Sequence, residues 1–136
     1  MKYQATVVEM PEIHLVVCKA DEFPKGIQAS WDKLESKLSS LKGRKFYGLS
    51  YEEANDMVYY AGVVPLNDAE VASLGFPQKV IAGGRYARAK LMDWSKHLDE
   101  IPAIFKKLMS EFKMGDGPAI EYYHSQYELY LLIPIV

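Results

Sequence analysis

Carboxylates set among tyrosines are the chemically most specific pattern in this sequence. Glu121 precedes Tyr123, and Glu128 precedes Tyr130, by two residues each. A carboxylate between aromatic rings attracts a cation, and each ring face adds about 0.5 to 2 kcal/mol of cation-π attraction. Partial burial would also raise the pKa of such a glutamate and suit it to general acid or base chemistry. On an open sheet face, however, Glu128 is equally an ordinary exposed carboxylate.

The aromatic residues and the charge balance narrow the class of ligand. The chain has ten Tyr, five Phe and two Trp. Tyrosine combines an apolar face with a polar tip, which suits a wet groove, although strands favour it as well. The 18 acidic and 16 basic residues give a net charge of -2, which disfavours direct nucleic-acid binding.

The length of the chain and its apolar runs predict a single domain over residues 1–136. A chain of 136 residues can bury one core. Its apolar runs fall far short of the roughly 18 residues that a membrane helix needs, and the N-terminus lacks a signal pattern. We therefore expect a cytoplasmic protein without membrane association.

Two segments show the periodicity of amphipathic helices. The first stripe predicts a helix of about four turns that stops at Gly43. The second tolerates Pro102 in its first turn and ends before Gly115. We expect Trp31 to lie in the core. The stripes consist of Ile27, Trp31, Leu34, Leu38 and Leu41, and of Ile101, Phe105, Leu108, Met109 and Phe112.

Strand-like segments flank both helices in the same order, which predicts an internal duplication. Repeat one covers about 1–65, a polar linker with one helical turn covers 66–77, and repeat two covers about 78–136. Aligning the closing prolines, Pro65 and Pro134, equates Tyr59 with Glu128. The predicted strands are 13–20, 46–51 and 57–64 in the first repeat, and 85–91, 119–124 and 127–133 in the second.

The alternation of the last strand predicts which face carries a site. Leu129, Leu131 and Ile133 form an apolar face that we place under the helices, so that Glu128 and Tyr130 point away from them. The expected fold is α+β, with duplicated βαββ units forming a curved antiparallel sheet. Two helices cover one face, and a ligand groove lies on the other.

The order and spacing of three segments resemble the gyrase-inhibitor-like small-molecule-binding domain. This domain is also the effector-binding part of AraC-type and MerR-type regulators. The segments are FYGLSYEE (46–53), IAGGRYARAKL (81–91) and GPAIEYYHSQYELYLLIPI (117–135). The resemblance implies a groove for hydrophobic, often cationic molecules, with a central glutamate that corresponds to Glu128 or Glu121. We rank Glu128 first because of its strand face.

Three functions follow from these observations. The first is a stand-alone binding domain for multidrug-type or effector-type molecules. The second, implied by the resemblance, is hydrolysis of strained cyclopropane-bearing toxins, with Glu128 and Tyr130 as catalytic candidates. The third is interaction with DNA gyrase, and a transcription regulator is a further candidate partner.

The three histidines lack metal-ligand spacing, so neither a metal nor another cofactor is expected. The ligand-binding candidates are Glu128, Glu121, Tyr123, Tyr130, Tyr59, Tyr51 and Trp94.

Overall fold

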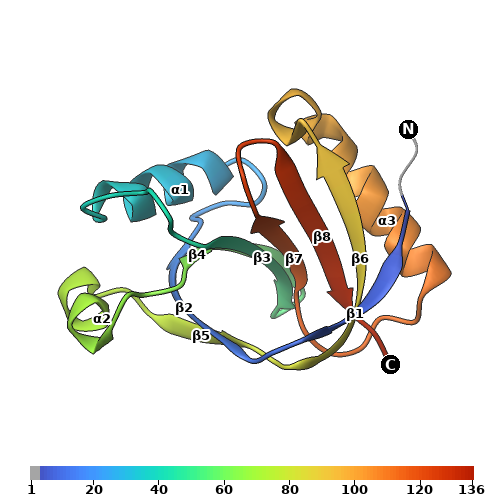
Figure 1. Cartoon of the computed structure of the whole chain (residues 1–136), viewed down its shortest axis with the longest axis horizontal. Helices are drawn as coiled ribbons and strands as arrows, with labels where there is room; N and C mark the ends of the chain where they lie inside the picture. The colour runs from blue at the N-terminus through green and yellow to red at the C-terminus, as the bar shows by residue number, and fades with distance from the viewer. Residues whose placement is uncertain (1–3) are drawn as a thin grey trace.

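One antiparallel sheet runs through the computed structural model, which describes residues 4–136 (Figure 1). Its strands are β1 (Thr6–Met10), β2 (Ile13–Lys19), β3 (Phe46–Glu53), β4 (Asp56–Val63), β5 (Gln78–Ile81), β6 (Gly84–Met92), β7 (Ala119–Tyr123) and β8 (Glu128–Pro134). The helices are α1 (Ile27–Ser36), α2 (Asp68–Leu74) and α3 (Ile101–Glu111), with 3₁₀ turns η1 (Trp94–Lys96) and η2 (Leu98–Glu100) before α3. Among these residues, no helix is long and apolar enough to cross a membrane.

The strand order is β1-β6-β8-β7-β3-β4-β2-β5, and the sheet curls into a half barrel. This order maps onto itself when β1 to β4 are equated with β5 to β8. At the centre, β3 pairs with β7 and Gly48 lies opposite Glu121. At the edges, β1 pairs with β6 while β5 pairs with β2, so the first strand of each half completes the other half.

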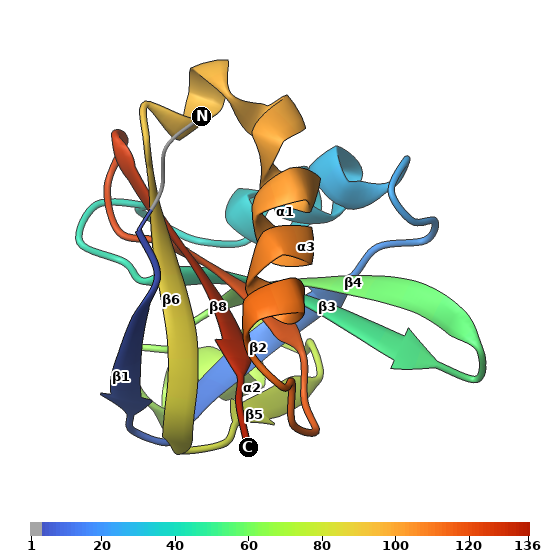
Figure 2. The same ribbon diagram turned by 90° about the vertical axis from the view of Figure 1, so that its right-hand side faces the viewer.

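The helices cover one face of the sheet, as the sequence predicts. In α3, Ile104 and Leu108 are fully buried and pack on Leu129, Leu131 and Ile133 of β8. Helix α1 packs with Leu34 on residues of β2 and β4, in a second cluster on the same face. Figure 2 shows α3 in front of the sheet and the β3–β4 hairpin extending beyond its body. The predicted curved α+β sheet is therefore confirmed.

Helix α1 is shorter than the predicted four turns, because apolar residues at helical spacing continue in the sequence beyond the last helical residue. The helix ends at Ser36, and the N–H groups of Lys37 and Leu38 bond to carbonyls three residues back. Leu38 still packs on the core, but Leu41 is 46% exposed. Serines at 39 and 40 favour turns over helix, which is consistent with this early end.

Three further boundaries differ from the sequence-based expectation. The hairpin between β3 and β4 turns on Ala54 and Asn55 alone, with φ of 50° and 71°. Strand β3 therefore extends to Glu53, beyond its predicted end at residue 51, and β4 lies one residue earlier than predicted. The two edge strands, β1 and β5, are absent from the predicted strands. Strand β1 has exposed Val7 and Glu9 with only weak alternation, and β5 spans just Gln78–Ile81. The linker contains two helical turns, α2, rather than one.

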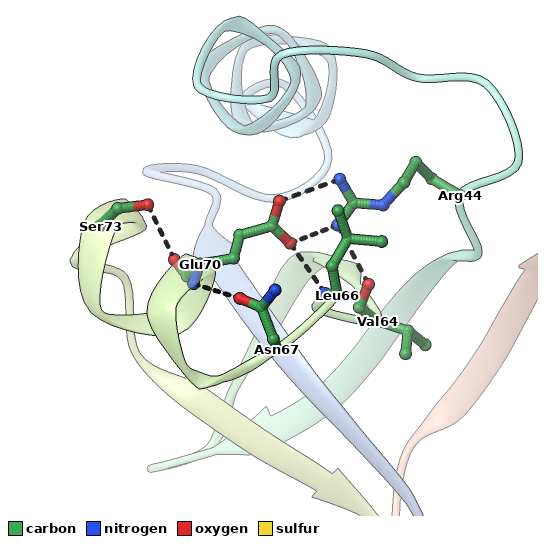
Figure 3. A network of polar contacts seen from close by, with 6 residues as sticks. All are labelled: Arg44, Val64, Leu66, Asn67, Glu70 and Ser73. Carbon is green, nitrogen blue, oxygen red and sulfur yellow. Dashed lines mark hydrogen bonds and ion pairs between the residues drawn. The ribbon is translucent and has the colours of Figure 1, made fainter.

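A polar network fixes α2 to the ends of β3 and β4 (Figure 3). Arg44 donates hydrogen bonds to the carboxylate of Glu70 and, at 3.1 Å, to the carbonyl of Val64. Glu70 also accepts from Leu66 N–H, and Asn67 caps the helix by accepting from Glu70 N–H. Burial alone would raise the pKa of Glu70, but these hydrogen bonds outweigh burial and lower it. The network holds the chain immediately after β4 in place.

Candidate functional site

Glu121 lies at the centre of the sheet, on the face that the helices cover. The alternation of β7 directs Glu121 and Tyr123 to this face, while Ile120 packs into the cluster on the opposite one. Oε1 of Glu121 accepts a hydrogen bond of 2.7 Å from the hydroxyl of Tyr59 and another of 2.7 Å from that of Tyr123. Two phenols from two strands thus converge on one carboxylate oxygen.

Two tryptophans from the two helical segments complete this cluster. Trp31 of α1 donates its indole N–H to the Tyr59 hydroxyl at 3.0 Å and contacts the ring of Tyr123 edge to face at 5.4 Å. Trp94 of η1 contacts Tyr123 edge to face at 5.0 Å, and its N–H bonds to the Ser125 carbonyl. Figure 1 shows α1 and α3 on either side of β7. Both tryptophans remain partly exposed.

Gly48 of β3 makes room for the contact between carboxylate and phenol. It lies directly opposite Glu121 in the sheet. A Cβ at Gly48 would overlap the Tyr59 hydroxyl and lie 2.5 Å from Oε1 of Glu121. A glycine inside a strand often marks such a close approach. These residues therefore form a unit, which we call the Glu121 cluster: Glu121, Tyr59, Tyr123, Trp31, Trp94 and Gly48.

The electrostatics of the Glu121 cluster favour a Glu121 carboxyl that is either protonated or paired with a cation from outside the protein. Burial raises the pKa of Glu121, and the hydrogen bonds from the two tyrosines only partly offset this. Burial, followed by the charge of Glu121, raises the pKa of Tyr59 and Tyr123 well above the ordinary value. Both phenols therefore stay protonated and donate. Among residues 4–136, no Lys, Arg or His forms an ion pair with Glu121.

The structure brings together four of the predicted ligand-binding residues and separates three. The four that cluster are Glu121, Tyr123, Tyr59 and Trp94. The other three lie outside this cluster. Glu128 begins β8 and pairs with Lys90 at 3.4 Å, Tyr130 lies on the opposite face near Arg88, and Tyr51 packs on Tyr60 in the distant hairpin.

The predicted equivalence of Tyr59 and Glu128 is wrong by one residue. Gly48 pairs with Ala61 in one hairpin, and Glu121 pairs with Leu131 in the other. With Gly48 and Glu121 facing each other at the centre, Tyr59 corresponds to Leu129. A slip of one residue moves a side chain to the other face of a sheet, so Tyr59 and Glu128 point in opposite directions.

Sequence reasoning missed two residues of the cluster. Trp31 lies on the helical stripe and was expected in the core, and its stripe position says nothing about where its N–H points. Gly48 lies inside a predicted strand, and a glycine in the interior of a strand pattern is the signal in the sequence that points to such a close approach.

The face without helices carries a pocket of about 660 Å³. This is where the sequence placed a groove. Tyr130 lines it, together with Tyr47, Tyr122 and Arg88, whereas neither glutamate candidate is among its lining residues. This pocket and the Glu121 cluster are therefore on opposite faces of the sheet.

Neither a family model nor a curated protein sequence matches the chain. Solved structures match it over nearly its full length. An integron cassette protein from the mobile metagenome of Vibrio cholerae has a TM-score of 0.74 at 16% identity, covering 98% of this chain and 97% of the other. SAV2435, solved bound to tetraphenylphosphonium, has a TM-score of 0.65 at 18% identity and coverages of 100% and 94%. The C-terminal domain of EcmrR has a TM-score of 0.60 at 13% identity and coverages of 100% and 99%.

These structures give the chain a fold class. They are consistent with the gyrase-inhibitor-like fold that the sequence resemblance implies, and that prediction is confirmed. At identities of 13% to 18%, the likeness extends to the fold alone.

Proposed function

We propose that this domain binds hydrophobic cations at the Glu121 cluster. The observation that carries the proposal is a carboxylate surrounded by aromatic rings and lacking a cationic partner within residues 4–136. A buried carboxylate without a counter-charge is costly, and a bound cation removes that cost. The structure of SAV2435 with tetraphenylphosphonium, a lipophilic cation, supports this ligand class for the shared fold.

The aromatic residues would supply the remaining selectivity. Trp31 and Trp94 flank Tyr123 and remain partly exposed, so their rings are available to an incoming ligand. Each ring face contributes about 0.5 to 2 kcal/mol to a cation held against it. A hydrated cation such as Na⁺ gains little from such walls, whereas a cation with phenyl or alkyl groups also buries apolar surface.

The test is a titration of tetraphenylphosphonium followed by tryptophan fluorescence and by calorimetry. Glu121→Gln removes the charge and keeps the shape, and we expect it to weaken binding about tenfold or more. Glu128→Gln makes the same exchange on the opposite face and should leave the affinity unchanged. Triphenylphosphine oxide, which is neutral, should bind wild type and Glu121→Gln equally. Equal tetraphenylphosphonium affinity in wild type and Glu121→Gln would overturn the proposal.

Hydrolysis is a second candidate function, favoured by the raised pKa of Glu121. Such a carboxyl can act as a general base that takes a proton from water. Binding ranks first because both phenols already donate to the same carboxylate oxygen, which leaves that oxygen less basic. Turnover of a cyclopropane-bearing substrate that disappears in Glu121→Gln would support hydrolysis, and no turnover above buffer would remove it. Association with DNA gyrase or a transcription regulator stays a prediction.

A further inference from the structure

Three tyrosines form a ladder across the face of the sheet that the helices leave open. Tyr47, Tyr122 and Tyr130 are direct cross-strand neighbours on β3, β7 and β8. The rings of Tyr47 and Tyr122 stack with centroids 4.6 Å apart and planes inclined by 13°. Those of Tyr122 and Tyr130 lie 6.1 Å apart at 23°. Three nearly parallel rings in a row give the pocket an ordered aromatic wall.

The rings of Tyr47 and Tyr122 are electrically neutral at ordinary pH. Burial, followed by the neighbouring Tyr122, raises the pKa of Tyr47 to about 12. Burial, followed by Tyr130, raises the pKa of Tyr122 as well. Neither of these two rings therefore carries a phenolate charge that would repel an anion.

Positive groups without acidic partners stand beside the ladder. The guanidinium of Arg88 lies 4.6 Å from the ring centroid of Tyr130, and within residues 4–136 it forms no ion pair. Lys45 lines the pocket and likewise has no ion pair among the described residues. The acidic residue in the lining, Glu12, is hydrogen-bonded to His14 at 2.7 Å. The wall therefore carries uncompensated positive charge.

The rim of the pocket is held by the Arg44 network. Val64 and Pro65 belong to the lining, and Arg44 bonds to the Val64 carbonyl while Glu70 accepts from Leu66 N–H. A volume of about 660 Å³ lies in the range of small-molecule pockets, which is roughly 300 to 1,000 Å³. The pocket thus combines suitable size, a fixed rim, an aromatic wall and unpaired cations.

We propose that this pocket is a second binding site, selective for planar aromatic anions. Because the faces of the three tyrosine rings are turned to one another, a flat ring system would pack across the edges of the ladder in edge-to-face contacts. Its carboxylate or sulfonate would pair with Arg88, whose planar fork matches such groups bidentately. The site is separate from the Glu121 cluster, because Tyr122 and Glu121 are adjacent on β7 and point to opposite faces.

The experiment compares three pyrene probes of one shape and different charge, followed by fluorescence anisotropy. These are 1-pyrenecarboxylate, 1-pyrenemethanol and 1-pyrenemethylammonium. We expect the carboxylate to bind most tightly to wild type. Arg88→Gln should weaken the carboxylate about tenfold or more and leave the alcohol unchanged. Arg85→Gln removes the same charge from β6 at an exposed position outside the pocket and should change neither.

A second variant tests the ladder independently of charge. Tyr122→Leu should weaken both the carboxylate and the alcohol, with far-UV circular dichroism confirming that the sheet is intact. Equal affinity for the carboxylate and the ammonium probe, or unchanged carboxylate binding in both Arg88→Gln and Tyr122→Leu, would overturn the proposal. Tetraphenylphosphonium titrated against Arg88→Gln should bind as it does to wild type. The two titrations therefore distinguish a failure of the proposed pocket site from a failure of the proposed site at the Glu121 cluster.

Discussion

On the helix-covered face of the sheet, Glu121 of β7 lacks a cationic partner among residues 4–136, whereas on the open face Arg88 of β6 lacks an acidic partner among the same residues. Within the Glu121 cluster Tyr59 is only 1% exposed, whereas Glu121, Tyr123 and Trp31 are partly exposed. The pocket beside the tyrosine ladder, on the face without helices, is open and has a volume of about 660 Å³. The difference shows how the two-residue alternation of a strand can give the two faces of one sheet side chains of opposite charge.

The largest expected loss of stability comes from Arg44, which holds the rim of the pocket and does not contact the Glu121 cluster. Arg44→Met leaves the largely buried Glu70 carboxylate without its partner, because the side chains of the pair are only 5% and 14% exposed. We expect a loss of about 3 kcal/mol in the free energy of unfolding, measured with urea. Pyrenecarboxylate binding should fall more than tetraphenylphosphonium binding. Equal losses for both ligands would mean that the rim does not distinguish the two faces.

The next largest effect is expected at Gly48. Gly48→Ala places a methyl group against the Tyr59 hydroxyl and Glu121, which forces side chains apart and should cost about 1 to 3 kcal/mol of stability. It should also weaken tetraphenylphosphonium binding. Gly115→Ala serves as the control, because its added Cβ meets nothing closer than 3.7 Å. Similar stability losses in both variants would contradict the assigned role of Gly48.

A smaller effect is expected from the indole N–H of Trp31. Trp31→Phe keeps an aromatic ring on α1 but removes the donor to the Tyr59 hydroxyl, and should cost about 1 kcal/mol in urea unfolding. Trp94→Phe loses a bond to the exposed carbonyl of Ser125 and should cost less. A larger loss in Trp94→Phe than in Trp31→Phe would argue against Trp31 as the anchor of Tyr59.

The smallest effect is a change in the pH dependence of stability. Because burial raises the pKa of Glu121 above its ordinary value of 4.5, the folded chain holds this proton more tightly than the unfolded chain. The resulting stability is fully present below pH 4.5 and is lost as the pH rises through the folded pKa. From pH 4 to pH 7, wild type should therefore lose stability relative to Glu121→Gln. Parallel stability curves from urea unfolding would contradict this.

Much of the fold could be predicted because periodicity depends only on local order along the chain. The stripe from Ile101 to Phe112 predicts the position of α3, and Leu129, Leu131 and Ile133 correctly predict the face beneath it. Weakly patterned segments escaped prediction. Strand β1 is stabilised by pairing with β6, which lies far away in the sequence.

The candidate site was harder to predict, because it depends on register between strands. Glu121 and Glu128 have equally plausible tyrosine neighbours in the sequence. Only the pairing of Gly48 with Glu121 and with Ala61 places Tyr59 over Glu121. Alternation along β7 is by itself enough to put Glu121 and Tyr123 on one face and Tyr122 on the other.

The exchange of edge strands has a consequence for how the molecule comes apart. Strand β1 begins the first half but pairs with β6 of the second, and β5 begins the second half but pairs with β2 of the first. Neither half can unfold without removing an edge strand from the other, so we expect the two halves to unfold together rather than independently. Amide protons of β2 and β6 should therefore exchange with solvent at similar rates, in a single cooperative opening.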